Sequence, residues 1–332
     1  MKSFNRKSVK RLAAKNTADK RAYQEVFLHS LVVMGAGLLI MALDYILQQQ
    51  IGGTGGLSGI GTRTLLETAR TVLQYANMLL VPFWQMGIFY WAIRRARRKE
   101  TQLSDFLEGF RRFGPVLRLK LLQGIVVGLI FVVAILLSSV IFAVSPLAWP
   151  VMKLLLPYTQ DAEGMQTLMM NEALMAQIEA QMYPVYIILA ILLIPALLPL
   201  FYRFRMAEYV IMDKKGTGAI LALIRSFQMT RKQSGRMIKL DLSHWWYLAL
   251  QLVAEVLLYI ELLLPLIGVA PPQGVPLLLL NYGGYYGVLL IVYTLFRGRV
   301  ETTYALVYNI LNASVPEPKP LVIPDRTPWV GQ

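Results

Sequence analysis

The sequence predicts an all-α fold, a polytopic transmembrane helical bundle with six spans, and three observations lead to that prediction. The 332 residues are 56% hydrophobic and 16% charged, whereas an average soluble domain is about 25% charged. Six stretches are mostly apolar over the roughly 20 residues that a helix needs to cross the hydrocarbon core. These stretches contain no Lys or Arg, although the chain has 33 of them. The predicted spans are 26–47, 72–93, 121–144, 183–202, 244–267 and 276–296.

The basic residues between the spans predict the orientation of the chain. From the N-terminus onward, the segments outside the spans hold eight, two, nine, one, nine, no and four Lys or Arg residues. Cytoplasmic loops of membrane proteins carry the excess of Lys and Arg. We therefore expect both termini, and 30 of the 33 basic residues, on the cytoplasmic side. Residues 1–312 are predicted to form a single membrane domain, and 313–332 a Pro-rich cytoplasmic tail.

The net charge of +14 would ordinarily suggest a nucleic-acid partner. No segment between the spans is large enough to form a compact basic domain, so we expect no such partner. The predicted anionic partner is instead the headgroup layer of the lipid bilayer. The basic side chains that we expect to contact anionic headgroups are Arg94, Arg95, Arg97, Arg98, Arg231 and Lys232.

Three segments between the spans are predicted to form short amphipathic helices that lie at the membrane interface. In 104–113 and 217–232, apolar residues recur at helical spacing and basic residues follow them. The segment 164–181 lies on the other side and is rich in methionine. Clustered methionines could bind copper(I), but flexible Met side chains that fill an apolar face are far commoner. The apolar positions are Phe106, Leu107, Phe110 and Phe113 in the first segment and Ile220, Leu223, Ile224 and Phe227 in the second.

The span 244–267 holds two of the three acidic residues found within spans, Glu255 and Glu261. An intramembrane carboxylate is costly and is by default a functional candidate, as a proton relay or a ligand for a cation or substrate. The structural alternative is a Glu that hydrogen-bonds polar groups of a neighbouring helix. The span 276–296 offers such groups next to three glycines, which allow close approach. The candidate polar path through the membrane is Glu255, Glu261, Asn281, Tyr282 and Tyr285.

Enzymatic chemistry has little support in the sequence. The chain has no Cys and only two His, which excludes a Cys nucleophile and a His-rich metal site. The metalloprotease motif H-E-x-x-H and the hydrolase motif G-x-S-x-G are both missing. Asp241, Ser243 and His244 have the composition of a catalytic triad, but Ser243 and His244 are adjacent and diverge on a helix. We expect neither an enzyme nor a cofactor.

Two parts of the sequence echo each other. Each begins with a proline in a predicted span and reaches a Phe-Tyr pair near the end of that span, namely Phe89-Tyr90 and Phe201-Tyr202. A basic loop, a short amphipathic segment and a Lys between two apolar residues, Lys120 or Lys239, then precede the next span. Internal repeats of this kind are common in transporters.

One family resemblance rests on specific segments. Tyr202–Asp213 reads YRFRMAEYVIMD and is followed by ALIRS at Ala222–Ser226, by MTRK at Met229–Lys232 and by LDLSHWW at Leu240–Trp246. This order resembles the bacterial integral-membrane family catalogued as domain of unknown function 975. The resemblance implies a polytopic helical protein of the bacterial plasma membrane and carries no established activity or site residues.

Transport, or an accessory role in transport beside a transporter ATPase, is the function that these observations favour. The competing interpretation is a non-transporting membrane scaffold, or a factor of envelope homeostasis, that recruits partners through its basic cytoplasmic loops. The carboxylates inside the membrane favour the first interpretation, and the basic loops are what the second one requires.

Overall fold

The structure is a computed structural model that describes residues 4–53, 60–158, 170–270 and 274–316. Most of the residues that it describes are helical and none of them forms a strand, so the all-α prediction is confirmed. Five helices are long and apolar enough to cross a membrane: Lys20–Ile51, Thr62–Ala96, Phe113–Val144, Ala173–Asp213 and Leu279–Asn312.

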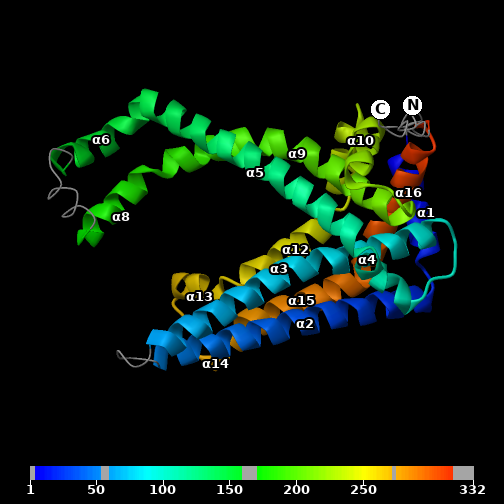
Figure 1. The fold of residues 1–332 in the computed structure, drawn as a ribbon, viewed down its shortest axis with the longest axis horizontal. Helices are drawn as coiled ribbons and strands as arrows, with labels where there is room; N and C mark the ends of the chain where they lie inside the picture. Colours follow the sequence, from blue (N-terminus) through cyan, green and yellow to red (C-terminus); the bar gives the residue numbers. More distant parts are fainter. Residues whose placement is uncertain (1–3, 54–59, 159–169, 271–273, 317–332) are drawn as a thin grey trace, which may run out of the picture.

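The long helices form two arms that diverge from a common base (Figure 1). The first, called here the four-helix arm, is a bundle of helices from the first and the last third of the chain. The second, the two-helix arm, is a hairpin with two shorter helices at its far end. The four-helix arm contains α2 (Lys20–Gly53), α3 (Ile60–Ala96), α12 (Trp245–Leu257) and α15 (Gly284–Val292), and the two-helix arm contains α5 (Phe113–Val144), α6 (Trp149–Leu155), α8 (Glu172–Gln181) and α9 (Tyr183–Asp213).

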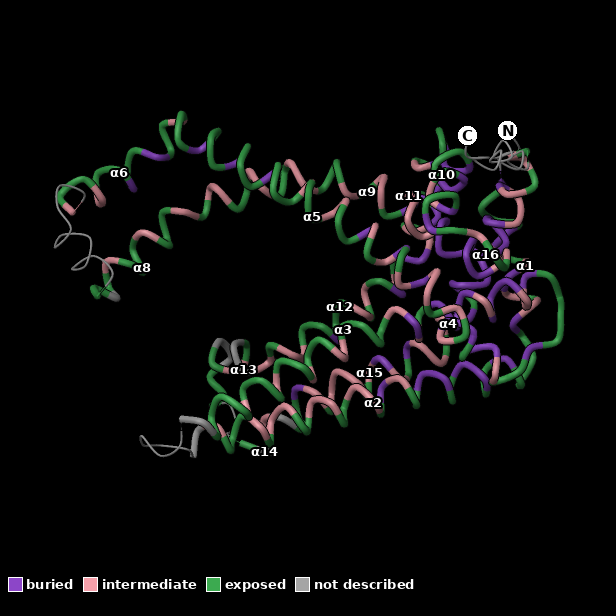
Figure 2. The backbone as a smooth tube through the Cα atoms, viewed as in Figure 1, coloured by how far each residue is buried: buried purple, intermediate pink, exposed green. Residues whose placement is uncertain are grey.

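The base where the arms meet is called the junction, and most of the buried residues lie there (Figure 2). Its core includes large side chains that are fully buried, among them Trp91, Met206, Tyr209 and Tyr304. The arms beyond it expose many apolar side chains, as expected of surfaces that face lipid. Besides the ends of α3, α5 and α9, the junction contains α1 (Arg6–Asn16), η2 (Leu103–Leu107), α4 (Glu108–Arg111), α10 (Ala219–Thr230), α11 (Ser234–Leu242) and α16 (Gly298–Asn312).

The segment predicted as the interfacial helix 104–113 packs against α3 instead of lying free on the membrane. Gly87 of α3 faces the backbone of Phe106 so closely that a Cβ there would overlap the Phe106 carbonyl oxygen. Phe106 is buried and its ring stacks on that of His29, with centroids 4.2 Å apart. Leu107 and Phe113 stay exposed, so only part of the predicted apolar face is available to lipid.

The other two predicted interfacial segments are helical where they are described. In α10 the apolar side chains of Ile220, Ile224 and Phe227 are exposed, which fits the predicted interfacial helix. At the far end of the two-helix arm, α8 covers part of the Met-rich segment, and residues up to 169 lie outside the described residues. Most of the predicted tail, from residue 317 onward, also lies outside them.

Four of the six predicted spans lie within the long helices, and the predicted span 276–296 overlaps the last of them from Leu279 onward. The predicted span 244–267 is not one continuous helix, because α12 ends at Leu257 and is followed by α13 (Ile260–Leu263) and η5 (Leu264–Ile267). A helix of 13 residues is about 20 Å long, which is less than the hydrocarbon thickness. The sixth crossing therefore stays a prediction.

The last long helix contains two π-helical segments, η6 (Leu279–Gly283) and η7 (Tyr293–Arg297). The second lies between α15 and α16, where the chain enters the junction. Single π-turns inside α-helices are rare and occur frequently at functional sites.

Candidate functional site

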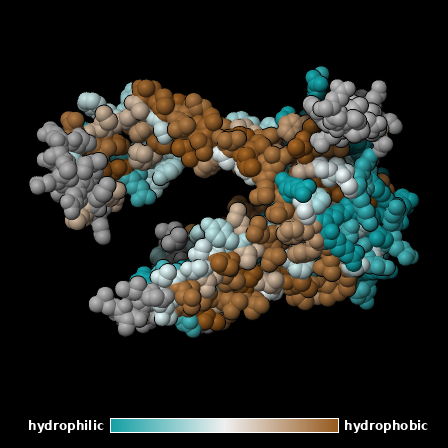
Figure 3. All heavy atoms as spheres, viewed as in Figure 1, coloured by the Kyte–Doolittle hydropathy of each residue, from teal (hydrophilic) through white to brown (hydrophobic). Residues whose placement is uncertain are grey.

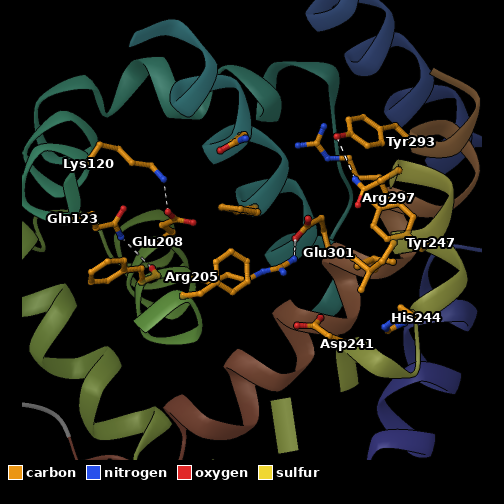
Figure 4. Close-up of a pocket in the computed structure, with 17 residues that line it drawn as sticks. Lys120, Gln123, Arg205, Glu208, Asp241, His244, Tyr247, Tyr293, Arg297 and Glu301 are labelled. Carbon is orange, nitrogen blue, oxygen red and sulfur yellow. Dashed lines mark hydrogen bonds and ion pairs between the residues drawn. The ribbon is translucent and has the colours of Figure 1, made fainter. Parts of the chain in front are cut away.

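A cavity of about 470 Å³ lies where the two arms meet, and side chains from both arms line it (Figure 4). We call it the junction cavity. α5 and α9 supply one side, and α3, α12 and the last long helix supply the other. Its charged lining side chains are Lys120, Arg205, Glu208, Asp241, Arg297 and Glu301.

The two-helix arm contributes an ion pair and an amide to the cavity wall. Lys120 and Gln123 are three residues apart on α5, so they lie on one helix face. Lys120 Nζ forms an ion pair with Glu208 of α9, and Gln123 Nε2 donates to the Phe204 carbonyl oxygen at 3.3 Å. These contacts fix the hairpin of α5 and α9 at its base.

A second ion pair crosses between the arms. Arg205 of α9 donates to Glu301 Oε2 of α16 at 2.8 Å, and Tyr209 Oη donates to the same oxygen at 3.0 Å. The Arg205 guanidinium also lies 3.5 Å from the centre of the Tyr304 ring. Both charged side chains are largely buried, at 14% and 9% exposed, so breaking this pair would leave an uncompensated charge in the junction.

Asp241 and His244 line the cavity from α11 and from the turn before α12. Asp241 accepts hydrogen bonds from Tyr202 Oη, at 2.7 Å, and from Tyr304 Oη. Burial raises the pKa of the Asp241 carboxyl, since the charged form loses hydration. His244 Nδ1 lies 3.2 Å from the Leu240 carbonyl oxygen, which only accepts, so Nδ1 carries the proton. Its Nε2 is buried and has no hydrogen-bond partner among the described residues.

Arg297 is the last residue of η7 and differs from the other cations of the cavity. Among the described residues it has no ion pair or hydrogen bond, and its one specific contact is with the Tyr293 ring, whose centre lies 4.4 Å away. Tyr293 Oη in turn accepts a hydrogen bond from Gln251 Nε2 of α12 at 3.4 Å. In Figure 4 Arg297 and Tyr293 lie on the side of the cavity opposite Lys120 and Glu208.

Two further cavities follow along the four-helix arm. One of about 250 Å³ lies between α2, α3 and α15 and shares Gln85, Tyr293 and Arg297 with the junction cavity. The other, of about 840 Å³, lies at the far end of the arm, between the end of α2 and the start of α3. The polar side chains of the smaller one include Asn77, Tyr285 and Tyr286.

The structure brings together some members of the predicted polar path. Tyr285 Oη donates to Glu255 Oε1 at 3.3 Å, so α12 and α15 are joined through these two residues. Asn281 and Tyr282 instead line the cavity at the far end of the arm. The Glu261 side chain lies outside the described residues.

Of the basic residues predicted to contact lipid headgroups, three are engaged in ion pairs. Arg94 pairs with Asp105 at 2.9 Å, Arg95 with Asp19 and Glu25, and Arg97 with Asp213. Arg98, Arg231 and Lys232 are exposed, and the structure as described gives them no ion pair. Lipid contact by these six residues stays a prediction.

The cavity residues that sequence reasoning missed are the charged ones. The residues Lys120, Arg205, Glu208, Asp241, Arg297 and Glu301 all fall outside the predicted spans. There the basic residues indicated topology, Asp241 was considered only as part of a triad, and the two Glu residues received no role. The signal that could have found them is the segment Tyr202–Asp213, in which Arg205 and Glu208 are three residues apart and therefore share a helix face.

A family model described as "Protein of unknown function (DUF975)" matches residues 1–313. The chain belongs to this family. No curated protein and no solved structure matches the chain. In this DUF975 protein, the segments Tyr202–Asp213 and Leu240–Trp246 supply Arg205, Glu208, Asp241 and His244 to the junction cavity. Within the described ranges, no group of three or more His, Asp or Glu is arranged to hold a metal ion.

Proposed function

We propose that this DUF975 protein transports a solute across the bacterial plasma membrane, or assists a transporter that does, with both termini in the cytoplasm. The junction cavity is the proposed binding site. The observation that carries the proposal is a cavity lined by three cations and three carboxylates at the base of two arms of apolar helices. Charged side chains that face a cavity between membrane helices are typical of substrate or ion pathways.

The polar contacts along α12 support a path from this site into the membrane. Gln251 and Glu255 are one helical turn apart. Gln251 donates to Tyr293 Oη, and Glu255 accepts from Tyr285 Oη. The small cavity beside Tyr285 shares three residues with the junction cavity. The Glu255 side chain itself is exposed on α12 and hydrogen-bonded to Tyr285, and our proposal is that its carboxylate carries a proton or holds a substrate group along this path.

The substitution Glu255→Gln tests this proposal, because it removes the charge and keeps the side-chain size. We compare the metabolites and lipids of cells and medium for a deletion strain and for the same strain with wild-type or variant protein. Glu179→Gln is the matched control, since Glu179 is an exposed carboxylate on α8, at the far end of the two-helix arm. We expect wild type and Glu179→Gln to restore the profile and Glu255→Gln to leave it altered.

Equal amounts of folded protein in the membrane are required for this comparison, and the unfolding temperature of each purified variant provides that check. The proposal fails if Glu255→Gln restores the profile as well as wild type does. It also fails if deletion of the protein changes no metabolite or lipid.

A scaffold that recruits partners through basic loops is the second candidate. The exposed Arg98, Arg231 and Lys232 favour it, because no ion pair among the described residues occupies them. Charge reversal at Arg231 and Lys232 would then abolish co-purification of a partner, such as a transporter ATPase, and leave the profile of a transport substrate intact. Charge reversal at the exposed Arg63 is the control.

A further inference from the structure

The junction cavity has as many cations as carboxylates, but one of each lacks an ion pair among the described residues. Glu208 pairs with Lys120, and Glu301 pairs with Arg205. The remaining carboxylate, Asp241, is bound by two tyrosine hydroxyls. Arg297 has five N–H donors, and none of them meets an acceptor among the described residues. A half-buried guanidinium with free donors is a binding group for a carboxylate or phosphate, which it can hold through two parallel hydrogen bonds.

The depth of the cavity matches that of lipid headgroups. Lys120 directly precedes the predicted span 121–144, and Arg297 directly follows the predicted span 276–296. Arg205 lies three residues beyond the end of the predicted span 183–202. The cavity therefore lies at one edge of the hydrocarbon core, in the layer that headgroups occupy.

Apolar side chains extend from the cavity along both arms. On α9, Phe201 lines the cavity, and Leu198, Ile194 and Ile191 continue its helix face at spacings of three and four. On α12, Leu248 lines the cavity and Leu252 follows one turn later. Each of these side chains is at least 40% exposed. Figure 3 shows the two arms as apolar surfaces on either side of the hollow that separates them.

From these observations we infer that the ligand of the junction cavity is an anionic phospholipid, whose phosphate binds Arg297 and whose acyl chains lie between the arms. This inference rests on the proposed function and names the substrate class of that same site. A soluble phosphate compound would use the charge of Arg297 but would leave the apolar rows of α9 and α12 without a role. A zwitterionic lipid would use those rows too, but its own cation would compete with Arg297 for the phosphate. Asp241, the carboxylate left without an ion pair among the described residues, is already bound by two tyrosine hydroxyls.

The test measures lipid binding to the purified full-length protein in detergent by native mass spectrometry. The probes are phosphatidylglycerol, phosphatidylcholine of the same chain length, and inorganic phosphate as a competitor. We expect a clear preference of the wild-type protein for phosphatidylglycerol, with millimolar phosphate leaving that binding intact. Arg297→Gln should weaken phosphatidylglycerol binding by about tenfold or more. Arg297→Lys should keep part of it, and Arg63→Gln, which removes an exposed cation far from the cavity, should not change it.

Three results overturn the inference: equal binding of the two lipids, wild-type phosphatidylglycerol binding by Arg297→Gln, or displacement of the lipid by inorganic phosphate. If Arg297→Gln does not fold, Phe201→Glu replaces it, since Phe201 is 53% exposed and its substitution places a negative charge in the cavity. Phe201→Glu should also weaken phosphatidylglycerol binding, and unchanged binding contradicts the inference. The two proposals can fail separately. If lipid binding depends on Arg297 but Glu255→Gln restores the cellular profile, transport is refuted and the headgroup site is not. The reverse result would refute the headgroup site alone.

Discussion

Glu25 shows how a single carboxylate organises the junction. Its Oε2 accepts hydrogen bonds from Trp91 Nε1 at 2.8 Å and from Thr101 Oγ1 at 2.6 Å. Arg95 and Arg21 form ion pairs with the same carboxylate, at 3.2 Å and 3.0 Å. The residue thereby joins α2 to α3 and to the segment that follows α3. With 4% of its surface exposed, Glu25 depends on these partners to keep its charge.

Replacing Glu25 should therefore destabilise the protein strongly. Glu25→Ala leaves Arg95 largely buried without this carboxylate, and we expect the free energy of unfolding to fall by about 3 kcal/mol. Denaturant titration of the purified protein in detergent measures the change. Glu67→Ala is the control, since that exposed pair should contribute about 0.5 kcal/mol or less. Equal effects of the two substitutions would show that the Glu25 contacts do not stabilise the junction.

At the scale of single residues, the sequence put Glu255 and Tyr285 in one candidate polar path and gave a hydrogen bond from Glu255 to the span 276–296 as the structural alternative. The structure places the two residues within hydrogen-bond distance, as that alternative requires. A Glu in an apolar stretch needs a polar partner, and the span 276–296 contains few polar side chains that could serve as one. The sequence did not predict the pairing of Arg205 with Glu301, which are 96 positions apart. Long-range pairs between charged residues outside the spans depend on how the helices meet, and hydropathy carries no information about that.

At the scale of elements, two glycines allow the contact between α3 and the segment 103–111. A Cβ on Gly87 would overlap the carbonyl oxygen of Phe106, and a Cβ on Gly109 would overlap that of Phe83. Because these neighbours are backbone atoms, they cannot rotate away as a flexible side chain would. The segment can therefore pack against α3 only while both positions remain glycine.

The substitution Gly87→Ala should accordingly lower the free energy of unfolding by about 2–3 kcal/mol, since the two elements must move apart. Gly128→Ala on α5 is the matched control, because nothing lies within 4 Å of the added methyl group. In an open helical position Ala is favoured over Gly by about 1 kcal/mol, so the control should be neutral or stabilising. A stabilising effect of Gly87→Ala would contradict the close approach.

Hydropathy predicted the long helices well, because the bilayer requires apolar residues along a whole span. It did not predict where a helix breaks. α12 ends through 3₁₀-type hydrogen bonds, from Leu258 N–H to the Glu255 carbonyl and from Tyr259 N–H to the Val256 carbonyl. Such a tightened turn does not change the average hydropathy of the surrounding apolar sequence, so hydropathy cannot locate it. The same holds for the π-helical segments of the last helix.

At the scale of the whole molecule, the charge distribution serves two purposes. The excess of Lys and Arg in alternate loops predicts orientation. Several of the same residues hold the junction together: Arg94, Arg95, Arg97 and Arg205 each pair with a carboxylate from another element. A net charge of +14 thus combines a topological label with the ion pairs of the base.

Cysteine labelling tests the orientation and the sixth crossing, and the absence of native Cys makes the background clean. We expect a membrane-impermeant maleimide to label Lys153→Cys and Val269→Cys in intact cells. Lys215→Cys, in the junction, should react only after the membrane is permeabilised. All three positions are exposed in the structure. If Val269→Cys behaves like Lys215→Cys, residues 244–267 do not cross the membrane and the six-span prediction is wrong.

The central claim is that the junction cavity between the arms is where the ligand binds and passes. Phe201 and Leu248 line that cavity from opposite arms. A chain with Phe201→Cys and Leu248→Cys is reconstituted into liposomes that contain fluorescent phosphatidylglycerol, and a reducible bis-maleimide joins the two arms. The account predicts that cross-linking lowers the rate of lipid movement between leaflets to that of protein-free liposomes, and that reduction restores it. Each single-Cys variant should keep its rate under the same treatment. An unchanged rate in the cross-linked protein would contradict the claim.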